Sequence, residues 1–339
     1  MRAMLLERVA SLADNPVPLR LADLPVPEPQ DGELLVRISC CGVCHTELDE
    51  IEGRTPPPAL PVVPGHQVIG RVVAAGGDVR RHKIGARVGV GWIHSSTGDP
   101  DENLSPEFVA TGRDTNGGYA EFMTVAERYA YPVPDAFSDV QAAPLMCAGG
   151  VGYRSLMLAG LRDGDVLGLT GFGSSGHLVL QLAKHLYPRS PVVVFARSPG
   201  ERAFALELGA DWSGATEDRP PQAPAAIIDT TPAWKPVLCA LERLRPGGRL
   251  VINAIRKEAA DRHLLAEIRY EDHLWMEKEI KSVANVTHHD LAAFLPIAAA
   301  VPLHVEVECY PLEKANEALR ALKAGHVRGA RVLKISAGD

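Results

Sequence analysis

The sequence lacks any long uninterrupted apolar run, and aromatic residues make up only 5% of its 339 residues. Its most apolar later stretch, residues 291–301, is too short to cross a bilayer, and Glu7, Arg8 and Asp14 interrupt the apolar residues of the N-terminus. The net charge is −7, and no run of Lys and Arg is long enough to follow a phosphate backbone. We therefore expect a cytoplasmic protein with no nucleic acid and no membrane as partner.

Cysteine is also scarce, with six residues in the chain. In a reducing cytosol these thiols stay reduced, so we expect metal binding or burial rather than disulfide bonds. Four of them have no metal-like spacing and are expected to be buried: Cys40, Cys41, Cys239 and Cys309.

What the chain does contain is a change of pattern near residue 150. Before it, short β-rich runs such as 33–39 alternate with Gly and Pro turns. After it, apolar strand-like runs alternate with helical stretches, as where residues 166–170 precede residues 176–186. Fully apolar strands that alternate with helices predict a doubly wound parallel sheet, and the length of the chain allows two domains.

A glycine-rich segment follows the first of these strands. It reads Gly171-Phe172-Gly173-Ser174-Ser175-Gly176, and a helical run begins directly after it. In this context the pattern is typical of dinucleotide binding, because the glycines let the backbone approach a pyrophosphate and the helix N-terminus donates N–H groups to it.

The end of the second strand indicates which dinucleotide binds. An acidic residue there would accept hydrogen bonds from the ribose hydroxyls of NAD(H), but the chain has Ala196, Arg197 and Ser198. A cation and a hydroxyl suit a 2′-phosphate, so NADP(H) is favoured over NAD(H). Solvent exposure of Arg197 is the competing interpretation, and NAD(H) stays possible.

Polar residues also stand where two later strands end. Thr230 follows the strand at residues 226–229, and Asn253 closes the run that begins at Arg249. Ligands bind at the carboxyl ends of such strands, so contacts to ribose or nicotinamide and loop capping are equally good interpretations.

Three residues could hold a metal ion: Cys44, His66 and Cys147. Two thiolates and an imidazole suit Zn²⁺ and leave a fourth position for water or substrate. Considered singly, each residue is more often structural, since free Cys behaves as a small buried apolar residue.

Taken together, the motifs resemble one family. CGVCHTEL, PGHQVIG, GGYAEF, PLMCAGGVGYRSL and GFGSSG occur in the order and spacing of the zinc-binding alcohol dehydrogenases, of the cinnamyl-alcohol-dehydrogenase-like kind, in the medium-chain dehydrogenase/reductase superfamily. The resemblance implies an α/β fold with two parts. A GroES-like β-rich catalytic domain would comprise residues 1–148 and 286–339, and a Rossmann domain would comprise residues 149–285.

The resemblance also implies roles for residues near the metal. Cys44, His66 and Cys147 would hold one catalytic zinc, and Glu47 would orient the ligating histidine and raise its basicity. Trp92 would form a wall of the substrate pocket.

Further roles concern protons and the cofactor. By resemblance, Thr46 would take the substrate's proton, and Asp49 stands where relatives have a histidine that ends the proton relay. A carboxylate is a weak base at neutral pH, since its ordinary pKa is about 3.9. His45 and Arg331 would lie near the cofactor pyrophosphate.

The sequence departs from the family pattern in a loop that commonly carries four cysteines for a structural zinc. Residues 95–102 contain no cysteine, so no structural zinc is expected, and Asp99, Asp101 and Glu102 are expected to form a solvated acidic loop. Gln67 replaces a glutamate that many relatives have near the zinc.

The leading hypothesis is a zinc alcohol dehydrogenase or aldehyde reductase that transfers hydride reversibly between a small-molecule alcohol and NAD(P), as a homodimer. One alternative is a zinc-free quinone or enone reductase of the same fold. Another is a non-catalytic nucleotide-binding protein. Trp275 is expected to be a core aromatic residue.

Overall fold

Two large sheets, one in each of two units, organise the chain in the computed structural model, which describes residues 1–301, 303–325 and 328–336. The β-rich unit comprises Met1–Cys147, Val286–Ala299 and Val305–Asp339, and the parallel-sheet unit comprises Ala148–Asn285 and Ala300–His304. Residues 302, 326–327 and 337–339, which the predicted catalytic domain includes, lie outside the described residues.

The main sheet of the β-rich unit is mostly antiparallel. Its strand order is β16 (Val307–Pro311), β17 (Ala330–Lys334), β3 (Glu33–Val43), β4 (Val68–Ala75), β5 (Arg87–Val90) and β9 (Ala130–Pro132), and β8 (Phe122–Ala126) also pairs with β3. Buried β-branched residues such as Val36, Val72 and Val88 fill its core. Two smaller pairs complete the unit: β1 (Arg2–Leu6) with β2 (Leu19–Asp23), and β6 (Ile93–Ser95) with β7 (Val109–Ala110).

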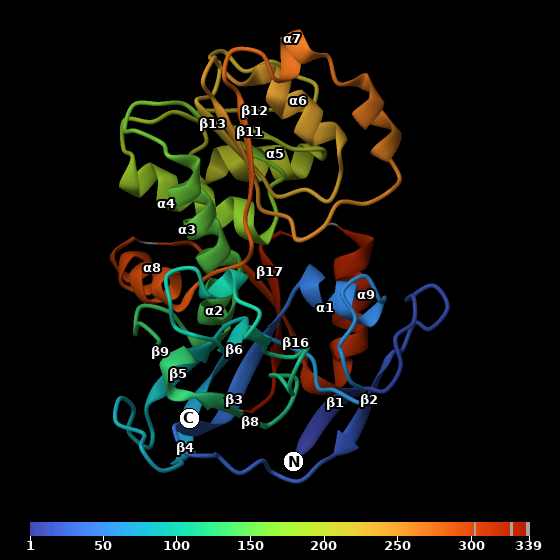
Figure 1. Ribbon diagram of the computed structural model, residues 1–339, viewed down its shortest axis with the longest axis vertical. Helices are drawn as coiled ribbons and strands as arrows, with labels where there is room; N and C mark the ends of the chain where they lie inside the picture. Colours follow the sequence, from blue (N-terminus) through green and yellow to red (C-terminus); the bar gives the residue numbers. More distant parts are fainter. Residues whose placement is uncertain (302, 326–327, 337–339) are drawn as a thin grey trace. The chain divides into compact units, whose positions relative to one another are not determined.

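The α-helices of this unit are α1 (His45–Ile51), α2 (Asp139–Ala142), α8 (His288–Ala300) and α9 (Ala315–Ala324). Helices α1 and α9 pack beside each other (Figure 1). Helix α1 begins two residues after β3 ends, so the strand fixes where the first turn of this helix lies.

The parallel-sheet unit has the strand order β12 (Trp212–Gly214), β11 (Val192–Phe195), β10 (Leu167–Thr170), β13 (Ala226–Asp229), β14 (Arg249–Ile252) and β15 (Glu279–Ser282). Every neighbouring pair is parallel. Its helices are α3 (Ala148–Ala159), α4 (Ser174–Leu186), α5 (Pro199–Glu207), α6 (Lys235–Arg243) and α7 (Tyr270–His273). Strands β10, β11 and β13 are buried throughout, which confirms the apolar alternating pattern as a parallel sheet.

Several expectations about burial are wrong, and one of them concerns Cys239, which is only half-buried. Trp275 is 53% exposed rather than in the core, because it follows short helix α7 near the exposed edge strand β15. Cys309 is exposed on edge strand β16, whereas Cys40 and Cys41 are buried as expected in the central strand β3. No helix in the described ranges is long and apolar enough to span a membrane.

Candidate active site

Three metal-ligand side chains come together in the β-rich unit. The Sγ atoms of Cys44 and Cys147 and a ring nitrogen of His66 all lie within 4.8 Å of one another. Cys44 directly precedes α1, His66 lies in the loop before β4, and Cys147 follows the 3-10 helix Ala143–Met146. Three segments far apart in the sequence therefore place two sulfurs and an imidazole at one point.

Glu47 organises two of these three residues. Its Oε2 accepts a hydrogen bond of 2.8 Å from the backbone N–H of Cys44, and its Oε1 lies 2.5 Å from Nδ1 of His66. Both Glu47 and His66 are almost completely buried. Both ring nitrogens of His66 are buried without a hydrogen bond in the described structure, and Nδ1 lies against the Glu47 carboxylate, which leaves Nε2 for a metal. An orphaned imidazole nitrogen close to two sulfurs fits a zinc ion.

Electrostatics stabilise one thiolate at the cluster, that of Cys44, whereas the hydrogen bond with Cys44 and burial raise the pKa of the Cys147 thiol well above its ordinary value. A hydrogen bond from Cys147 lowers the pKa of the Cys44 thiol well below its ordinary value, burial opposes this, and His66 adds to the lowering. Burial acts to lower the pKa of His66, but the charge of Glu47 and the contact with Cys44 outweigh it and raise that pKa well above the ordinary value. A thiolate is thus stabilised at the cluster before any ion binds.

An aromatic wall stands beside the cluster. Trp92 is 4% exposed and meets His66 edge to face, with ring centroids 4.9 Å apart. Phe108 stacks on Trp92 at 6.3 Å, and the Arg113 guanidinium lies over the Trp92 ring at 5.8 Å. Trp92, the predicted pocket wall, therefore lies directly against His66 and has the Arg113 guanidinium over its ring.

The glycine segment of the parallel-sheet unit forms a loop between β10 and α4. Gly171 has φ of +80°, and a Cβ there would lie 2.7 Å from Oγ1 of Thr230, so only glycine fits. Gly173 ends the loop, and a Cβ there would meet nothing within 4 Å. Phe172 is buried and packs edge to face on Phe204. The space beside Gly173 fits a phosphate approaching the N-terminus of α4.

Ser174, Ser175 and Gly176 form the first turn of α4 itself, so their backbone N–H groups belong to the helix N-terminus. Thr230 donates its hydroxyl to the carbonyl of Thr170 at 3.0 Å. The side-chain amide of Asn253 donates to Oγ of Ser155 at 2.7 Å. This hydrogen bond joins the end of strand β14 to helix α3.

At the end of β11 the three predicted residues differ in their surroundings. Ala196 is buried, whereas Arg197 is exposed and has no side-chain partner among the described residues. Ser198 caps α5, because its Oγ accepts from the backbone N–H of Glu201 at 3.1 Å. Arg202, which sequence reasoning missed, donates to the carbonyls of Ala196 and Arg197 at 2.9 and 3.0 Å. Its position one helical turn after Ser198 was the available signal.

Comparison with known proteins decides the family. Residues 30–135 match the model of the alcohol dehydrogenase GroES-like domain. The probable alcohol dehydrogenase AdhA of Mycobacterium tuberculosis is 40% identical over 334 residues, covering 94% of this chain and 93% of that protein. The chain belongs to the alcohol dehydrogenase family.

Other relatives agree with this assignment. The probable cinnamyl alcohol dehydrogenase 8A of Oryza sativa is 32% identical, with 91% of this chain and 89% of that protein covered. The solved cinnamyl alcohol dehydrogenase of Sorghum bicolor is 26% identical with a TM-score of 0.80, covering 98% of this chain and 97% of that one. The predicted resemblance, the GroES-like and Rossmann fold and the NAD(P)-dependent alcohol dehydrogenase activity are confirmed.

Within this alcohol dehydrogenase the remaining predicted residues lie as follows. Thr46 is buried in α1, with Oγ1 3.6 Å from Sγ of Cys44. Asp49 is fully buried, and its Oδ1 accepts from Nε of Arg54 at 2.7 Å. His45 is exposed at the first position of α1. Arg331 lies on β17 and donates to Oε2 of Glu308 at 3.1 Å.

Two buried residues near the cluster were missed. Glu50, one turn after Glu47 on α1, has an Oε1 with no partner, and burial together with the charge of Glu47 raises its pKa well above the ordinary value. The hydroxyl of Tyr119 is also buried without a partner, and burial raises its pKa. The three-residue spacing from Glu47 and the GGYAEF motif were the signals.

The cysteine-free loop corrects one expectation. Asp99 and Asp101 are exposed, but Glu102 is completely buried. Its Oε2 accepts from the Tyr129 hydroxyl at 2.7 Å and from the Gly98 N–H at 3.0 Å, and its Oε1 accepts from the His288 N–H at 2.5 Å. One carboxylate therefore anchors the loop from three sides, because these donors compensate its buried charge.

Proposed function

We propose that this alcohol dehydrogenase binds one catalytic Zn²⁺ through Cys44, His66 and Cys147, with no structural zinc, and interconverts a small-molecule alcohol and its aldehyde or ketone. The observation that carries the proposal is the cluster of three ligand atoms within 4.8 Å around an orphaned His66 nitrogen. Zinc bound there supplies a Lewis acid that polarises the substrate oxygen.

The chain's own residues would orient the substrate and move its proton. Glu47 fixes the ring of His66, and Trp92 covers one side of that ring. The Thr46 hydroxyl is the group beside Cys44 that can accept the alcohol's proton and pass it on. Asp49 remains the proposed end of the relay, and its Oδ1 accepts a hydrogen bond from Nε of Arg54 at 2.7 Å.

The proposed cofactor is NADP(H), and NAD(H) is the competing choice. Support comes from the absence of an acidic residue after β11, together with the unpartnered Arg197 and the nearby Arg202. The loop from Gly171 to Gly176 would hold the pyrophosphate, with Thr230 and Asn253 near the ribose or nicotinamide. His45 and Arg331 are the proposed basic groups for the pyrophosphate.

We also propose a cytoplasmic homodimer. All six cysteines are free, in keeping with a reducing compartment. Strand β15 is an exposed edge, and nearby apolar side chains are exposed as well: Ile268, Tyr270, Leu274, Trp275, Met276 and Ile280. An unpaired edge strand with apolar neighbours is the kind of surface that a second copy would cover.

The test combines metal content with turnover. The purified protein is expected to hold about one equivalent of zinc, as a site of this type binds a single ion. Reduction of aldehydes by NADPH should be lost when zinc is removed and should return when zinc is restored. Less than about half an equivalent of zinc with full activity would contradict the proposal and favour a zinc-free reductase.

Substrate class is tested separately. Primary, secondary, aliphatic and cinnamyl-type aldehydes and ketones are compared by kcat/KM with the zinc-loaded protein. NADPH binding without hydride transfer to any of them would favour a non-catalytic nucleotide-binding protein instead.

A further inference from the structure

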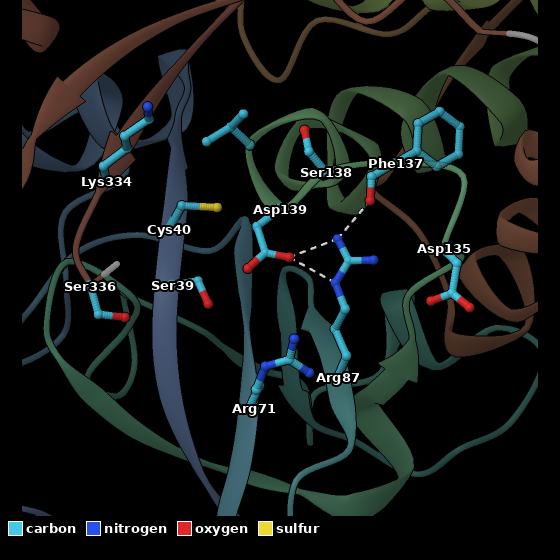
Figure 2. Close-up of a pocket in the computed structure, with 11 residues that line it drawn as sticks. Ser39, Cys40, Arg71, Arg87, Asp135, Phe137, Ser138, Asp139, Lys334 and Ser336 are labelled. Carbon is cyan, nitrogen blue, oxygen red and sulfur yellow. Dashed lines mark hydrogen bonds and ion pairs between the residues drawn. The ribbon is translucent and has the colours of Figure 1, made fainter. Parts of the chain in front are cut away.

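A pocket of about 520 Å³ lies in the β-rich unit. It is formed by β3, β4, β5, the end of β17 and the start of α2 (Figure 2). Its size is within the range of pockets that hold small molecules. No residue of the cluster at Cys44, His66 and Cys147 takes part in it.

Two arginines of the pocket lining, Arg71 and Arg87, belong to a row of three that lie in register across neighbouring strands. Arg37 on β3 is opposite Arg71 on β4, and Arg71 is opposite Arg87 on β5. Residues directly opposite each other in an antiparallel pair share a face, and like charges there destabilise the sheet. Such a row therefore calls for compensating negative charge.

Within the pocket lining, the protein supplies a carboxylate partner to Arg87 but none to Arg71. Nε and Nη2 of Arg87 both lie 2.7 Å from Oδ1 of Asp139, and Nη2 also donates to the Phe137 carbonyl at 2.7 Å. The side chain of Arg71 has no hydrogen bond or ion pair with any described residue, although it is half-buried and has an arginine opposite it on each neighbouring strand. Its charge stands uncompensated at the wall of the pocket.

Hydroxyl and amine donors complete the lining. Ser39 is only 8% exposed, yet its hydroxyl has no partner among the described residues, and Figure 2 shows it on the pocket side of β3. Lys334, on neighbouring strand β17, adds a second cation without a described partner. Of the two carboxylates in the lining, Asp139 is neutralised by Arg87, and Asp135 lies at the far side in Figure 2.

We propose that this pocket binds a small phosphate-bearing anion, with Arg71 and Lys334 as its counter-charges and Ser39 as a buried hydrogen-bond donor. Arginine forms paired hydrogen bonds to phosphate oxygens, and a charge-assisted bond is stronger than a neutral one. The volume leaves room for a second phosphate or a small organic group beside the first.

The experiment measures binding of pyrophosphate by calorimetry to the zinc-loaded protein saturated with NADPH, so that the dinucleotide loop is already occupied. We expect one site per chain with Kd of about 1 mM or tighter. R71M should weaken binding about tenfold or more, since a hydrogen bond to a charged group is lost, and S39A should weaken it several-fold. R71K should lie between R71M and the unchanged protein, because it keeps the charge but loses the paired geometry.

The matched control is R80M, which removes an arginine that is 81% exposed on the same unit and should leave binding unchanged. Thermal melting of each variant checks its folding, and S39A decides the matter if R71M is unfolded. Absence of binding, or equal binding by R71M, S39A and the unchanged protein, would overturn the proposal. Tighter binding of citrate than of pyrophosphate would overturn the phosphate assignment.

Discussion

The carboxylate of Glu47 lies 2.5 Å from Nδ1 of His66, while its other oxygen holds the backbone of Cys44. One buried side chain thus contacts two of the three residues that form the proposed zinc site. Because it sits at the third position of helix α1, any shift of this helix would move both contacts together.

Loss of Glu47 is therefore expected to weaken metal binding rather than only slow turnover. E47A should lower the affinity for zinc about 10- to 100-fold, and E47Q should lower it less because the amide oxygen can still accept from the ring. Competition with a zinc-binding dye measures this directly. E28A, at an exposed carboxylate, is the control, and equal zinc affinity of E47A and E28A would contradict the prediction.

The glycine loop allows folding and cofactor binding to be separated. G173A should change the free energy of unfolding by less than about 1 kcal/mol, since a Cβ there meets no atom within 4 Å, yet it should weaken NADPH binding about tenfold or more. G171A should destabilise the protein by about 2 kcal/mol, because of its φ of +80° and the approach to Thr230. Denaturant unfolding and fluorescence titration with NADPH measure the two effects. The reverse pattern would be incompatible with the proposed phosphate position.

Cofactor preference should depend on Arg197. R197A is expected to lower kcat/KM for NADPH about tenfold and to leave that for NADH nearly unchanged, because only NADPH carries the 2′-phosphate. R189A, at another exposed arginine of the same unit, provides the control. A preference of the unchanged protein for NADH would show the inference from the end of β11 to be wrong.

A pH effect on stability is expected at Glu52. Burial acts to raise its pKa, but hydrogen bonds from Lys323, the Leu12 N–H and Arg54 lower it from the ordinary value of 4.5 to about 2. A carboxylate with a depressed pKa stabilises the folded state above its unfolded pKa, and this contribution is lost as pH falls from about 5 toward 2. Since Lys323 and Arg54 are partly exposed, about 1–2 kcal/mol is a realistic magnitude at neutral pH.

E52Q tests this contribution. At pH 7 the variant should be less stable than the unchanged protein by that amount, and the gap should shrink as the pH falls below about 4. Denaturant unfolding across this range measures it. A gap that stays constant with pH would assign the loss to packing rather than to the charge of Glu52.

The sequence predicted the sheet of the second unit, and the coming together of Cys44, His66 and Cys147, for different reasons. Fully apolar strands such as residues 226–229 indicate burial on both faces, so the parallel sheet can be predicted from the hydrophobic pattern alone. The three proposed ligands come together only in the folded chain, and the motifs around them, rather than their spacing, predicted a common site. Nothing local in the sequence distinguishes Glu102 from Asp101, because burial depends on donors from Tyr129 and His288, far along the chain.

The same limit applies to the pocket at Arg71. Its row of arginines appears only when three strands are set in register, and register is a property of the folded sheet. Likewise Trp275 reads as a core residue until β15 is known to be an edge.

The buried carboxylate of Glu102 gives the cysteine-free loop an anchor made only of hydrogen bonds. Chelators and oxidants should not affect such an anchor, whereas they would disrupt a loop held by a zinc ion on four thiolates. Removal of the metal should therefore abolish activity while the loop stays folded. Recovery of activity on adding zinc would then report on the catalytic site alone.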